Sequence, residues 1–505
     1  MTNNVLYNIN GNKNSLSKLE EQYSTGKKIQ RPSDDPVIAT RALKLRTNLT
    51  ELNQYYEKNI PDALAWMDLT ESALTATNQM LTQIHTYCVN GSTDTLTEKD
   101  RDSILENLKE FKDQIYQQGN TNYAGRYVFS GYKTDTSLVF DKETTDYNYE
   151  ITQNLAGTDI DVIQTTLNSI DISMYDPNDP AALNLENKPN YVSAYRLRLA
   201  YDNIKTEEAG GAINLQVPVL DADGKATLDA DGNIIYVDFS GTVNRISSKD
   251  PNAYNPPAGD VINVLADTGE IVMSKDVYND WKGLEQIRVT YEKDTFSKND
   301  LRPEHYFDCS MTDLKAETPT TINYKKSNQD IRYEINFSQS MVVNTQGSDS
   351  ITHDIGRSID DITTAISAVK DVESKISEAK KMLEDTSISE QQKSALNEML
   401  DVLKTEKTLK DEVLQNTFAR TLTQVENQQN KMNVAIADLG SRYARIELTE
   451  SRLAIEKSDF EDLMSKNEDA DIVDTIIRLK SRETIYNASL NAAAKVVKNS
   501  LLEFI

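Results

Sequence analysis

Apolar residues recur every seven positions near the carboxyl end of the chain, within an otherwise polar segment that contains no proline. The positions are Phe418, Val425, Met432, Leu439, Ile446, Leu453 and Phe460. A strict seven-residue apolar repeat predicts one long helix that packs along a narrow seam against a second helix of the same period. At 1.5 Å per residue, this helix would be about 65 Å long.

A matching repeat lies near the amino end of the chain. It consists of Ile60, Met67, Leu74, Leu81 and Cys88, with Ala63, Thr70, Thr77 and Ile84 at the intermediate positions. The simplest interpretation is that the two ends of the chain pack together into one helical rod, which the middle of the chain leaves and rejoins. Pro61 predicts a small local adjustment at the start of this repeat.

Each end of the chain carries a further amphipathic helix. We expect the first to be interrupted at Gly11 and to stop at Gly26. Neither helix has an evident apolar partner elsewhere in the chain, so each predicts a binding surface, often one for copies of the same chain. The predicted assembly residues are Leu6, Ile9, Leu16, Leu19, Tyr23, Ile472, Ile476, Leu479, Tyr486, Leu490, Val497 and Leu501.

Capping signals mark the starts of several other helices. Ser33 or Asp34 is the expected cap of the helix that begins near Pro36, since proline suits a first turn. A capping box is predicted at Thr97 with Asp100, and a second one at Ser389 with Gln392.

The middle of the chain, from about Tyr123 to Gly347, is rich in Thr, Tyr, Val and Ile and holds most of the Pro and Gly. This texture predicts mostly β structure, with one helix expected near Tyr195–Ile204. Two subdomains are possible, divided near Pro177–Pro189 or Pro251–Pro257. The predicted fold class is therefore multidomain α+β, with a helical coiled-coil rod built from both chain termini and a mostly β central insert.

Composition narrows the functional classes. The 505 residues allow about three domains. Apolar residues make up 38%, which suits thin rods better than one thick core, and the formal net charge of −26 disfavours nucleic acid and anionic membranes as partners. No apolar run approaches the about 20 residues that span a membrane, and the first residues show no cleavable signal, so composition alone indicates the cytoplasm unless another export route exists.

Candidate chemistry is sparse. No zinc-protease, Walker or dinucleotide motif is present, so we expect no catalytic, metal or cofactor site. His85 with Cys88, and His305 with Cys309, have spacings that zinc ligands use, but Cys88 occupies an apolar repeat position. The two Leu-Asp-Ala-Asp-Gly segments at 220–224 and 228–232 lack the further ligands of a calcium loop and predict β-turns instead.

Several motifs resemble the flagellin superfamily. Tyr23-Ser24-Thr25-Gly26-Lys27-Lys28-Ile29, followed by Pro32-Ser33-Asp34-Asp35-Pro36, is similar to its amino-terminal signature. The proline after the two aspartates, and the segment from Asn122 to Gly131, look more like the hook–filament junction family, hook-associated protein 3, than like flagellin. At the other end, the similar segments are Leu439 to Arg442, Ser465 with Glu468 to Asp471, and Ser500 to Ile505.

The resemblance implies an inner coiled coil of both terminal helices, a helical rod outside it and a variable outer β domain. The implied divisions are 1–36 (amino-terminal assembly helix, paired with the last division), 37–131 (first half of the rod), 132–352 (outer domain), 353–463 (second half of the rod) and 464–505 (carboxyl-terminal assembly helix). Members leave the cell through the flagellar type III channel without a cleaved signal, which implies an extracellular location. The chain departs from the family in its enlarged centre and in extra helix around Ile388 to Leu414.

The functional hypothesis is a structural adaptor, without catalysis, that joins the flagellar hook to the filament. Implied partners are copies of itself, the preceding hook-associated protein, flagellin and an export chaperone. The alternatives are a filament-forming flagellin and a flagellin-like carrier of an active insert.

Overall fold

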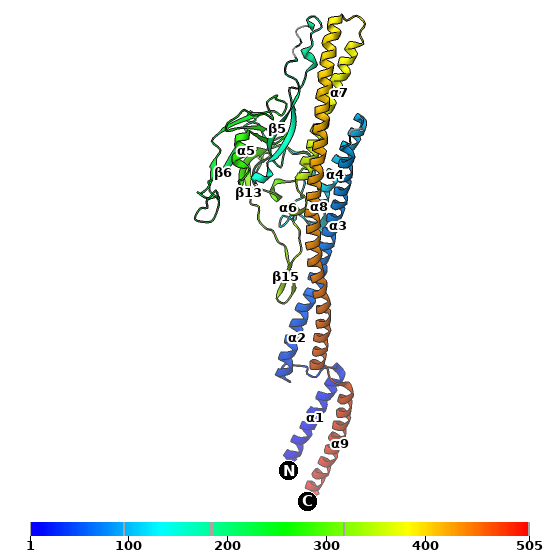
Figure 1. Cartoon of the computed structure of the whole chain (residues 1–505). Helices are drawn as coiled ribbons and strands as arrows, with labels where there is room; N and C mark the ends of the chain where they lie inside the picture. Colours follow the sequence, from blue (N-terminus) through cyan, green and yellow to red (C-terminus); the bar gives the residue numbers. More distant parts are fainter. Residues whose placement is uncertain (1, 94–95, 181–182, 184, 317–318, 503–505) are drawn as a thin grey trace. The chain divides into compact units, whose positions relative to one another are not determined.

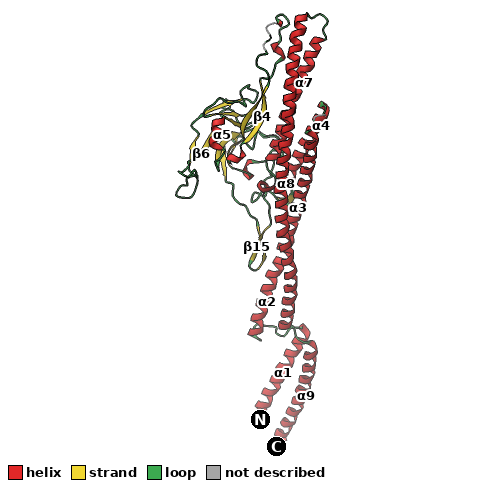
Figure 2. Cartoon of the chain, in the orientation of Figure 1, coloured by secondary structure: helices red, strands yellow, loops and turns green. Residues whose placement is uncertain are grey.

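The computed structural model describes residues 2–93, 96–180, 183, 185–316 and 319–502, with side chains for 3–495 within those ranges. Helices form both ends of the chain and strands form its middle (Figures 1 and 2). The predicted α+β fold class is confirmed.

Two compact units make up the chain. The first comprises Met1–Ala65, Arg332–Val342 and Ser441–Ile505, and the second comprises Trp66–Ile331 and Val343–Gly440. The five-part division expected from the resemblance concerns roles in assembly, and it stays a prediction.

The first unit is mostly helical and includes one hairpin. In chain order its elements are α1 (Thr2–Thr25), α2 (Pro36–Gln54), the π-helical turn η1 (Tyr55–Asn59), the start of α3 (Ile60–Gly91), β14 (Arg332–Asn336), β15 (Gln339–Val342), the end of α8 (Glu390–Glu468) and α9 (Ile472–Leu502). The predicted interruption at Gly11 is wrong, because a glycine inside a helix costs only about 1 kcal/mol and keeps its backbone hydrogen bonds. The predicted stop is confirmed, since α1 ends just before Gly26, whose φ is +70°.

The turn η1 explains how the helix passes Pro61. Proline has no N–H to donate to the carbonyl four residues earlier. The N–H of Ile60, the residue before Pro61, donates to the carbonyl of Tyr55, five residues earlier. This turn of the helix is therefore a π-helical turn, which contains one residue more than an α-helical turn. The predicted adjustment at Pro61 is confirmed. The β14–β15 hairpin packs on this turn, with the ring of Phe337 edge-on to Tyr55 at 5.5 Å between centroids.

The seven-residue repeat on α8 is buried, as predicted. Its first six residues are at most 1% exposed, and Phe460 is half-buried. In the second unit, α3 runs antiparallel to α8, because Thr82 meets Gln429 and the earlier Asn78 meets the later Asn433, both pairs at 3.1 Å. The α3 residues at repeat positions in this unit are fully buried as well: Met67, Leu74, Leu81 and Cys88.

The remainder of the second unit is two packed sheets beside helices. In chain order its further elements are α4 (Glu98–Gln118), β1 (Asn122–Tyr123), β2 (Arg126–Tyr127), β3 (Tyr147–Leu155), β4 (Asp161–Leu167), β5 (Asn190–Arg198), β6 (Ile213–Pro218), β7 (Tyr236–Asp238), β8 (Thr242–Ile246), β9 (Val261–Leu265), β10 (Glu270–Met273), α5 (Lys275–Trp281), β11 (Ile287–Lys293), β12 (Asp308–Asp313), β13 (Thr320–Tyr324), α6 (Gly347–Ser350) and α7 (Asp354–Leu383).

The sheets have the strand orders β4-β5-β10-β9-β8 and β13-β12-β3-β11-β6-β7. Among the strands that the structure describes, only β8 and β9 pair in parallel. Both sheets contribute to one apolar core. From the six-stranded sheet the core takes Tyr149, Ile151, Val289 and Tyr291, and from the five-stranded sheet Ile262, Val264 and Ile271.

The helix predicted at Tyr195–Ile204 is wrong, because its first four residues are the end of strand β5 and the residues after Arg198 form turn and loop. Tyr195, Leu197 and Leu199 alternate with polar residues, so the segment satisfies a period of two as well as a helical one. Pairing with β4 on one side and β10 on the other decides in favour of the strand.

The two Asp-Gly segments form β-turns, as predicted. Gly224 and Gly232 have φ of +78° and +85°, and bridges at Leu220–Ala226 and Leu228–Ile234 close the turns. Both predicted capping boxes are also present, at the starts of α4 and α8.

Candidate assembly surface

The terminal helices α1 and α9 pack against each other in the first unit. The Asn12 amide donates to the Ser489 hydroxyl at 2.9 Å, whereas Lys27, after α1, lies beside Asp469, before α9. The helices are therefore antiparallel. The expectation that neither terminal stripe has a partner within the chain is wrong, because each helix supplies a partner for the other.

This pairing divides the twelve predicted assembly residues. Half-buried side chains are those of Ile9, Leu16, Leu19, Leu479 and Tyr486, whereas exposed side chains are those of Leu6, Tyr23, Ile472, Ile476 and Leu490. Val497 and Leu501 lie outside the described side chains. A two-helix pair buries one stripe of each helix and leaves the flanks in solvent, so the exposed group is the part still open to another molecule.

The structure adds exposed apolar residues that the sequence analysis missed. On α1 and α9 they are Tyr7, Val473, Ile477 and Ile485, on α2 they are Val37 and Leu43, and on α8 they are Leu448, Ile455 and Leu463. A sequence signal for two of them existed, because Leu448 and Ile455 are seven residues apart. They follow the buried Ile446 and Leu453 by two positions, which places them on a different face of α8.

The exposed apolar side chains are concentrated in the first unit. Of 27 large apolar side chains that are exposed among the described residues, 15 belong to this unit, which holds 141 of the 505 residues. Scattered exposed apolar residues are normal, but such a concentration marks an interaction surface. We call these 15 side chains the apolar surface of the first unit.

A compact joint holds the ends of α1, α2, α8 and α9 together. Lys27 and Asp469 form an antiparallel β-bridge between the segment that follows α1 and the segment that precedes α9. Two backbone hydrogen bonds flank it: Lys28 N–H to the Glu468 carbonyl at 2.7 Å, and Ala470 N–H to the Gly26 carbonyl at 2.8 Å.

Charge reinforces the joint. The Glu468 side chain is only 5% exposed, and it accepts from Arg46 Nε at 2.8 Å and Nη2 at 2.5 Å. Lys27 Nζ lies 2.5 Å from Asp469 Oδ1 and 3.5 Å from Glu468 Oε2. The hydrogen bonds from Arg46 lower the pKa of Glu468 despite its burial, and the hydrogen bond from Lys27 lowers the pKa of Asp469. Both carboxylates are therefore ionised at neutral pH.

The aspartates of the two signature segments have local structural roles. Asp35 caps α2 by accepting from the N–H groups of Val37 and Ile38 at 3.0 and 3.1 Å, with Pro36 in the first turn. The prediction of Ser33 or Asp34 as the cap is wrong by one or two residues. Asp34 instead accepts from backbone N–H groups of the preceding loop. In the same way, Asp471 accepts from the first turn of α9.

Three of the four candidate zinc residues, Cys88, His305 and Cys309, lie in packed surroundings, whereas the His85 side chain is 37% exposed. Burial raises the pKa of the thiols of Cys88 and Cys309 to about 12. Burial also lowers the pKa of His305 to about 4. Within the described residues, no cluster of three or more His, Cys, Asp or Glu side chains is arranged to hold a metal ion, and none of the helices there is long and apolar enough to cross a membrane.

Comparison with known proteins agrees with the motifs. The family model of the bacterial flagellin N-terminal helical region matches residues 1–134. Flagellar hook-associated protein 3 of Salmonella typhimurium is 31% identical over 227 residues, which cover 41% of this chain and 69% of that protein. The Escherichia coli protein of the same name is 34% identical over 134 residues, covering 26% of this chain and 42% of that protein.

A flagellin of Clostridium tyrobutyricum is 35% identical over 121 residues, covering 24% of this chain and 32% of that protein. Among solved structures, flagellar hook associated protein-3 from Legionella pneumophila aligns with a TM-score of 0.28 at 11% identity, over 84% of this chain and 96% of that chain.

The match to the Salmonella protein extends over more than two thirds of that protein. It confirms the resemblance indicated by the motifs, and it places the chain among the structural components of the bacterial flagellum. This chain belongs to the hook-associated protein 3 family of the flagellin superfamily.

Proposed function

We propose that this chain is an adaptor without catalytic activity that joins the flagellar hook, through another hook-associated protein, to the flagellin filament. The observation that carries the proposal is the apolar surface of the first unit, which lies on helices α1, α2, α8 and α9 except for Phe337 of the β14–β15 hairpin. An apolar side chain of this size stabilises a contact by about 1.5–3 kcal/mol when it is fully buried, so even a few of them drive association.

The proposed mechanism is geometric. The joint at Lys27 and Glu468 fixes where the α1–α9 pair leaves the helices of the first unit, so that each copy presents its exposed stripes in the same way. Copies would form a ring through these stripes, and similar helices of the preceding hook-associated protein and of flagellin would stack on either side. An export chaperone would cover the same stripes before export, which would proceed without a cleaved signal. The net charge of −26 supports the absence of nucleic acid and membrane partners.

Negative-stain imaging of the purified chain, with and without short flagellar seeds under filament-promoting salt, tests the proposal. Subunits that cap or bridge seeds without extending them support the adaptor. Long filaments of this chain alone would identify a flagellin instead, which the match to a flagellin keeps as the main alternative. Zinc analysis of the purified protein tests the third hypothesis, an active insert.

Charged substitutions locate the surface. Ile476→Asp and Leu490→Asp place a carboxylate on exposed positions of α9, so we expect both to block seed binding and to leave the unfolding midpoint unchanged. Val237→Asp, at an equally exposed apolar position of β7 in the second unit, is the matched control. Loss of seed binding in the control, or intact binding in both α9 variants, would contradict the proposal.

A further inference from the structure

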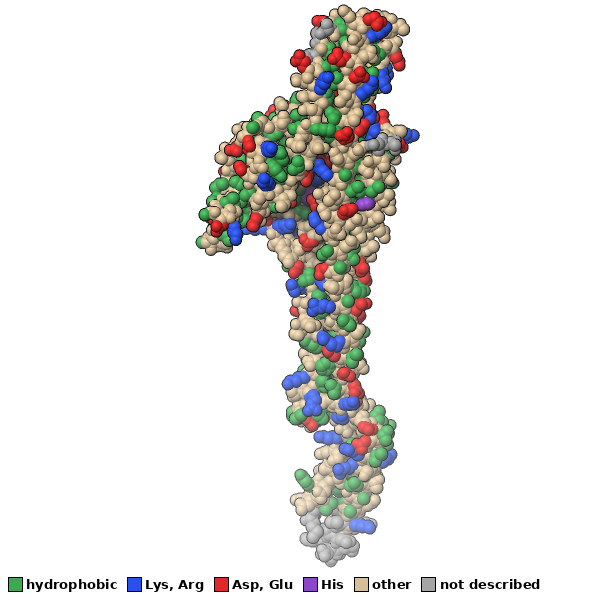
Figure 3. All heavy atoms as spheres, viewed as in Figure 1, with side chains coloured by type: hydrophobic (Ala, Val, Ile, Leu, Met, Phe, Trp, Pro, Cys, Tyr) green, Lys and Arg blue, Asp and Glu red, His purple; other side chains and the backbone are tan. Residues whose placement is uncertain are grey.

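A polar cleft of about 810 Å³ in the second unit has no part in the proposed assembly. Strands β3 and β5 border it on one side, and α7 and α8 on the other. Figure 3 shows a hollow between the β region and the helices, with Lys and Arg side chains gathered beside it. Small-molecule sites in proteins commonly have volumes of about 300–1,000 Å³.

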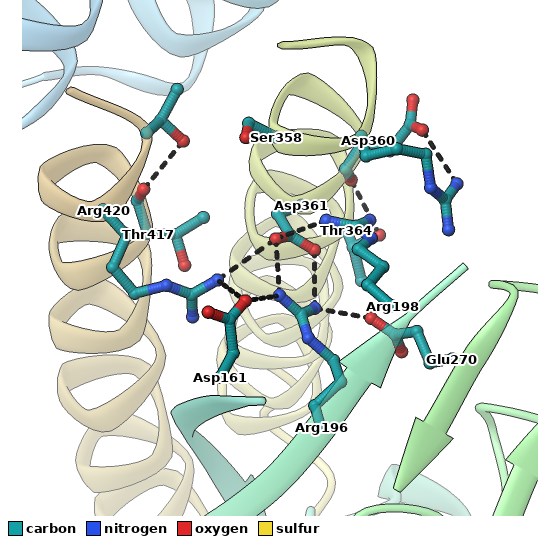
Figure 4. A network of polar contacts seen from close by, with 12 residues as sticks. Asp161, Arg196, Arg198, Glu270, Ser358, Asp360, Asp361, Thr364, Thr417 and Arg420 are labelled. Carbon is teal, nitrogen blue, oxygen red and sulfur yellow. Dashed lines mark hydrogen bonds and ion pairs between the residues drawn. The ribbon is translucent and has the colours of Figure 1, made fainter. Parts of the chain in front are cut away.

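Three of the arginines that line the cleft converge on one carboxylate. Arg196 and Arg198 of β5 and Arg420 of α8 all point toward Asp361 of α7 (Figure 4). Their nearest distances to its oxygens are 2.9, 2.6 and 3.2 Å, respectively. Arg196, which is 3% exposed, has additional partners in Glu270 at 2.5 Å and Asp161 at 3.2 Å.

Arg198 is the least compensated of the three. Its side chain is 15% exposed, and its ion pair is to Asp361, which it shares with the other two arginines. Its Nε is buried and has no hydrogen-bond partner among the described residues. Burial, together with the neighbouring positive charges of Arg357 and Arg196, lowers its pKa to about 10. A buried cation that shares its ion-pair partner with two other cations gains when a further anion binds beside it.

The rest of the lining supplies neutral hydrogen-bonding groups, three cations and two carboxylates. The cations are Arg357 and two lysines, and the carboxylates are those of Asp159 and of Asp354, which lies 3.3 Å from Lys431 Nζ. The side chains of Thr158, Gln424 and Asn427 line the cleft, as do the exposed Lys326 and Lys431. A further polar atom, Nε2 of the lining residue His353, is buried and has no hydrogen-bond partner in the part of the chain that the structure describes. Such groups suit a ligand that carries hydroxyls in addition to its charge.

We propose that this cleft binds a hydroxylated oxyanion about the size of a monosaccharide, either a sugar acid or a sugar phosphate. The oxyanion lies on the Arg198 guanidinium, whose planar fork matches a carboxylate or a phosphate. Lys326 and Lys431 attract it at the rim, and the amide and hydroxyl side chains bond the sugar hydroxyls. This inference is independent of the proposed assembly function.

Isothermal titration of the full chain at fixed ionic strength tests the inference with four probes: glucuronate, glucose 6-phosphate, glucose and sulfate. We expect at least one of the two anionic sugars to bind, and glucose and sulfate to bind about tenfold more weakly or not at all, because each lacks one of the two recognised features. The stronger anionic sugar identifies the oxyanion. Sulfate binding as tightly as the sugars would mean an adventitious ion only, and absence of binding by both anionic sugars would overturn the inference.

Variants locate the site. Arg198→Gln is expected to abolish binding, and Arg198→Lys, which keeps the charge without the fork, to retain part of it. Lys326→Ala, at an exposed position on the rim, is expected to weaken binding several-fold without any change in folding. The matched control is Lys325→Ala, at the neighbouring exposed lysine that does not line the cleft. Circular dichroism of each variant reports folding. Unchanged affinity in both Arg198→Gln and Lys326→Ala, or equal loss in Lys325→Ala, would refute the site.

Discussion

Leu453 and Leu448 lie five residues apart on α8 and differ only in the direction in which they point. Leu453 belongs to the seven-residue repeat and is fully buried, whereas Leu448 is 72% exposed. Truncating each to alanine therefore separates packing within the chain from contact between chains. Both positions are in the interior of the same helix, so the change in helix propensity is the same for the two variants.

Leu453→Ala is expected to lower the free energy of unfolding by about 2–5 kcal/mol, because it removes buried carbon atoms and leaves a cavity in the seam. Leu448→Ala is expected to change that free energy by less than about 0.5 kcal/mol. If Leu448 is buried between subunits, its loss removes about three methyl-sized groups from that contact. At about 0.8 kcal/mol each for complete burial, an incomplete contact loses about 2 kcal/mol, or about 30-fold in affinity.

Urea unfolding followed by circular dichroism at 222 nm measures the first effect, and titration of flagellar seeds with each variant measures the second. Leu448→Ala is expected to require about 30-fold more protein for half-saturation of the seeds at an unchanged unfolding midpoint. The reasoning is refuted if Leu448→Ala lowers the midpoint as much as Leu453→Ala does, or if it leaves seed binding unchanged.

Three further predictions concern the joint and the cysteines. Gly26→Ala is expected to lower the free energy of unfolding, measured in urea, by about 1–2 kcal/mol. The reason is backbone strain, because φ is +70° at this position while no neighbouring atom lies within 4 Å of an added Cβ. An unchanged free energy of unfolding would contradict the left-handed turn. The pKa values of Glu468 and Asp469 are lowered in the folded chain, so their stabilisation is complete above the unfolded values of about 4 and is lost as the pH falls through the folded ones. The unfolding midpoint should therefore fall as the pH is lowered from 6 to 3, and it should fall less steeply in Glu468→Gln than in the unmodified chain. Equal pH dependence in the two proteins would count against the joint. Because burial raises the pKa of Cys88 and Cys309 to about 12, a chromogenic thiol reagent at pH 8 should label neither in the native protein and both in urea. Rapid native labelling of Cys88 would show that the seam is open.

Local and periodic features of this chain could be read from its sequence. The apolar repeat at 418–460, the turns at 220–232 and the two capping boxes depend on residues that are close together in the chain, and the structure shows each of them. Errors arose where two local patterns competed. The segment around Leu197 fits a strand and a helix alike, and only its pairing with β4 and β10 decides between them.

What the sequence by itself determined is the period of the helices and, through its motifs, the family. What only the tertiary structure decided is which side chains meet. Arg196 and Asp361 are 165 residues apart, and Arg46 and Glu468 are 422 apart, so no local pattern announces either pair. The same holds for the terminal stripes, where Leu16 is half-buried and Leu490 is exposed although both fit one amphipathic pattern. A periodic sequence specifies that a helix has an apolar face, but burial depends on what packs against that face, and this is settled only when distant segments come together.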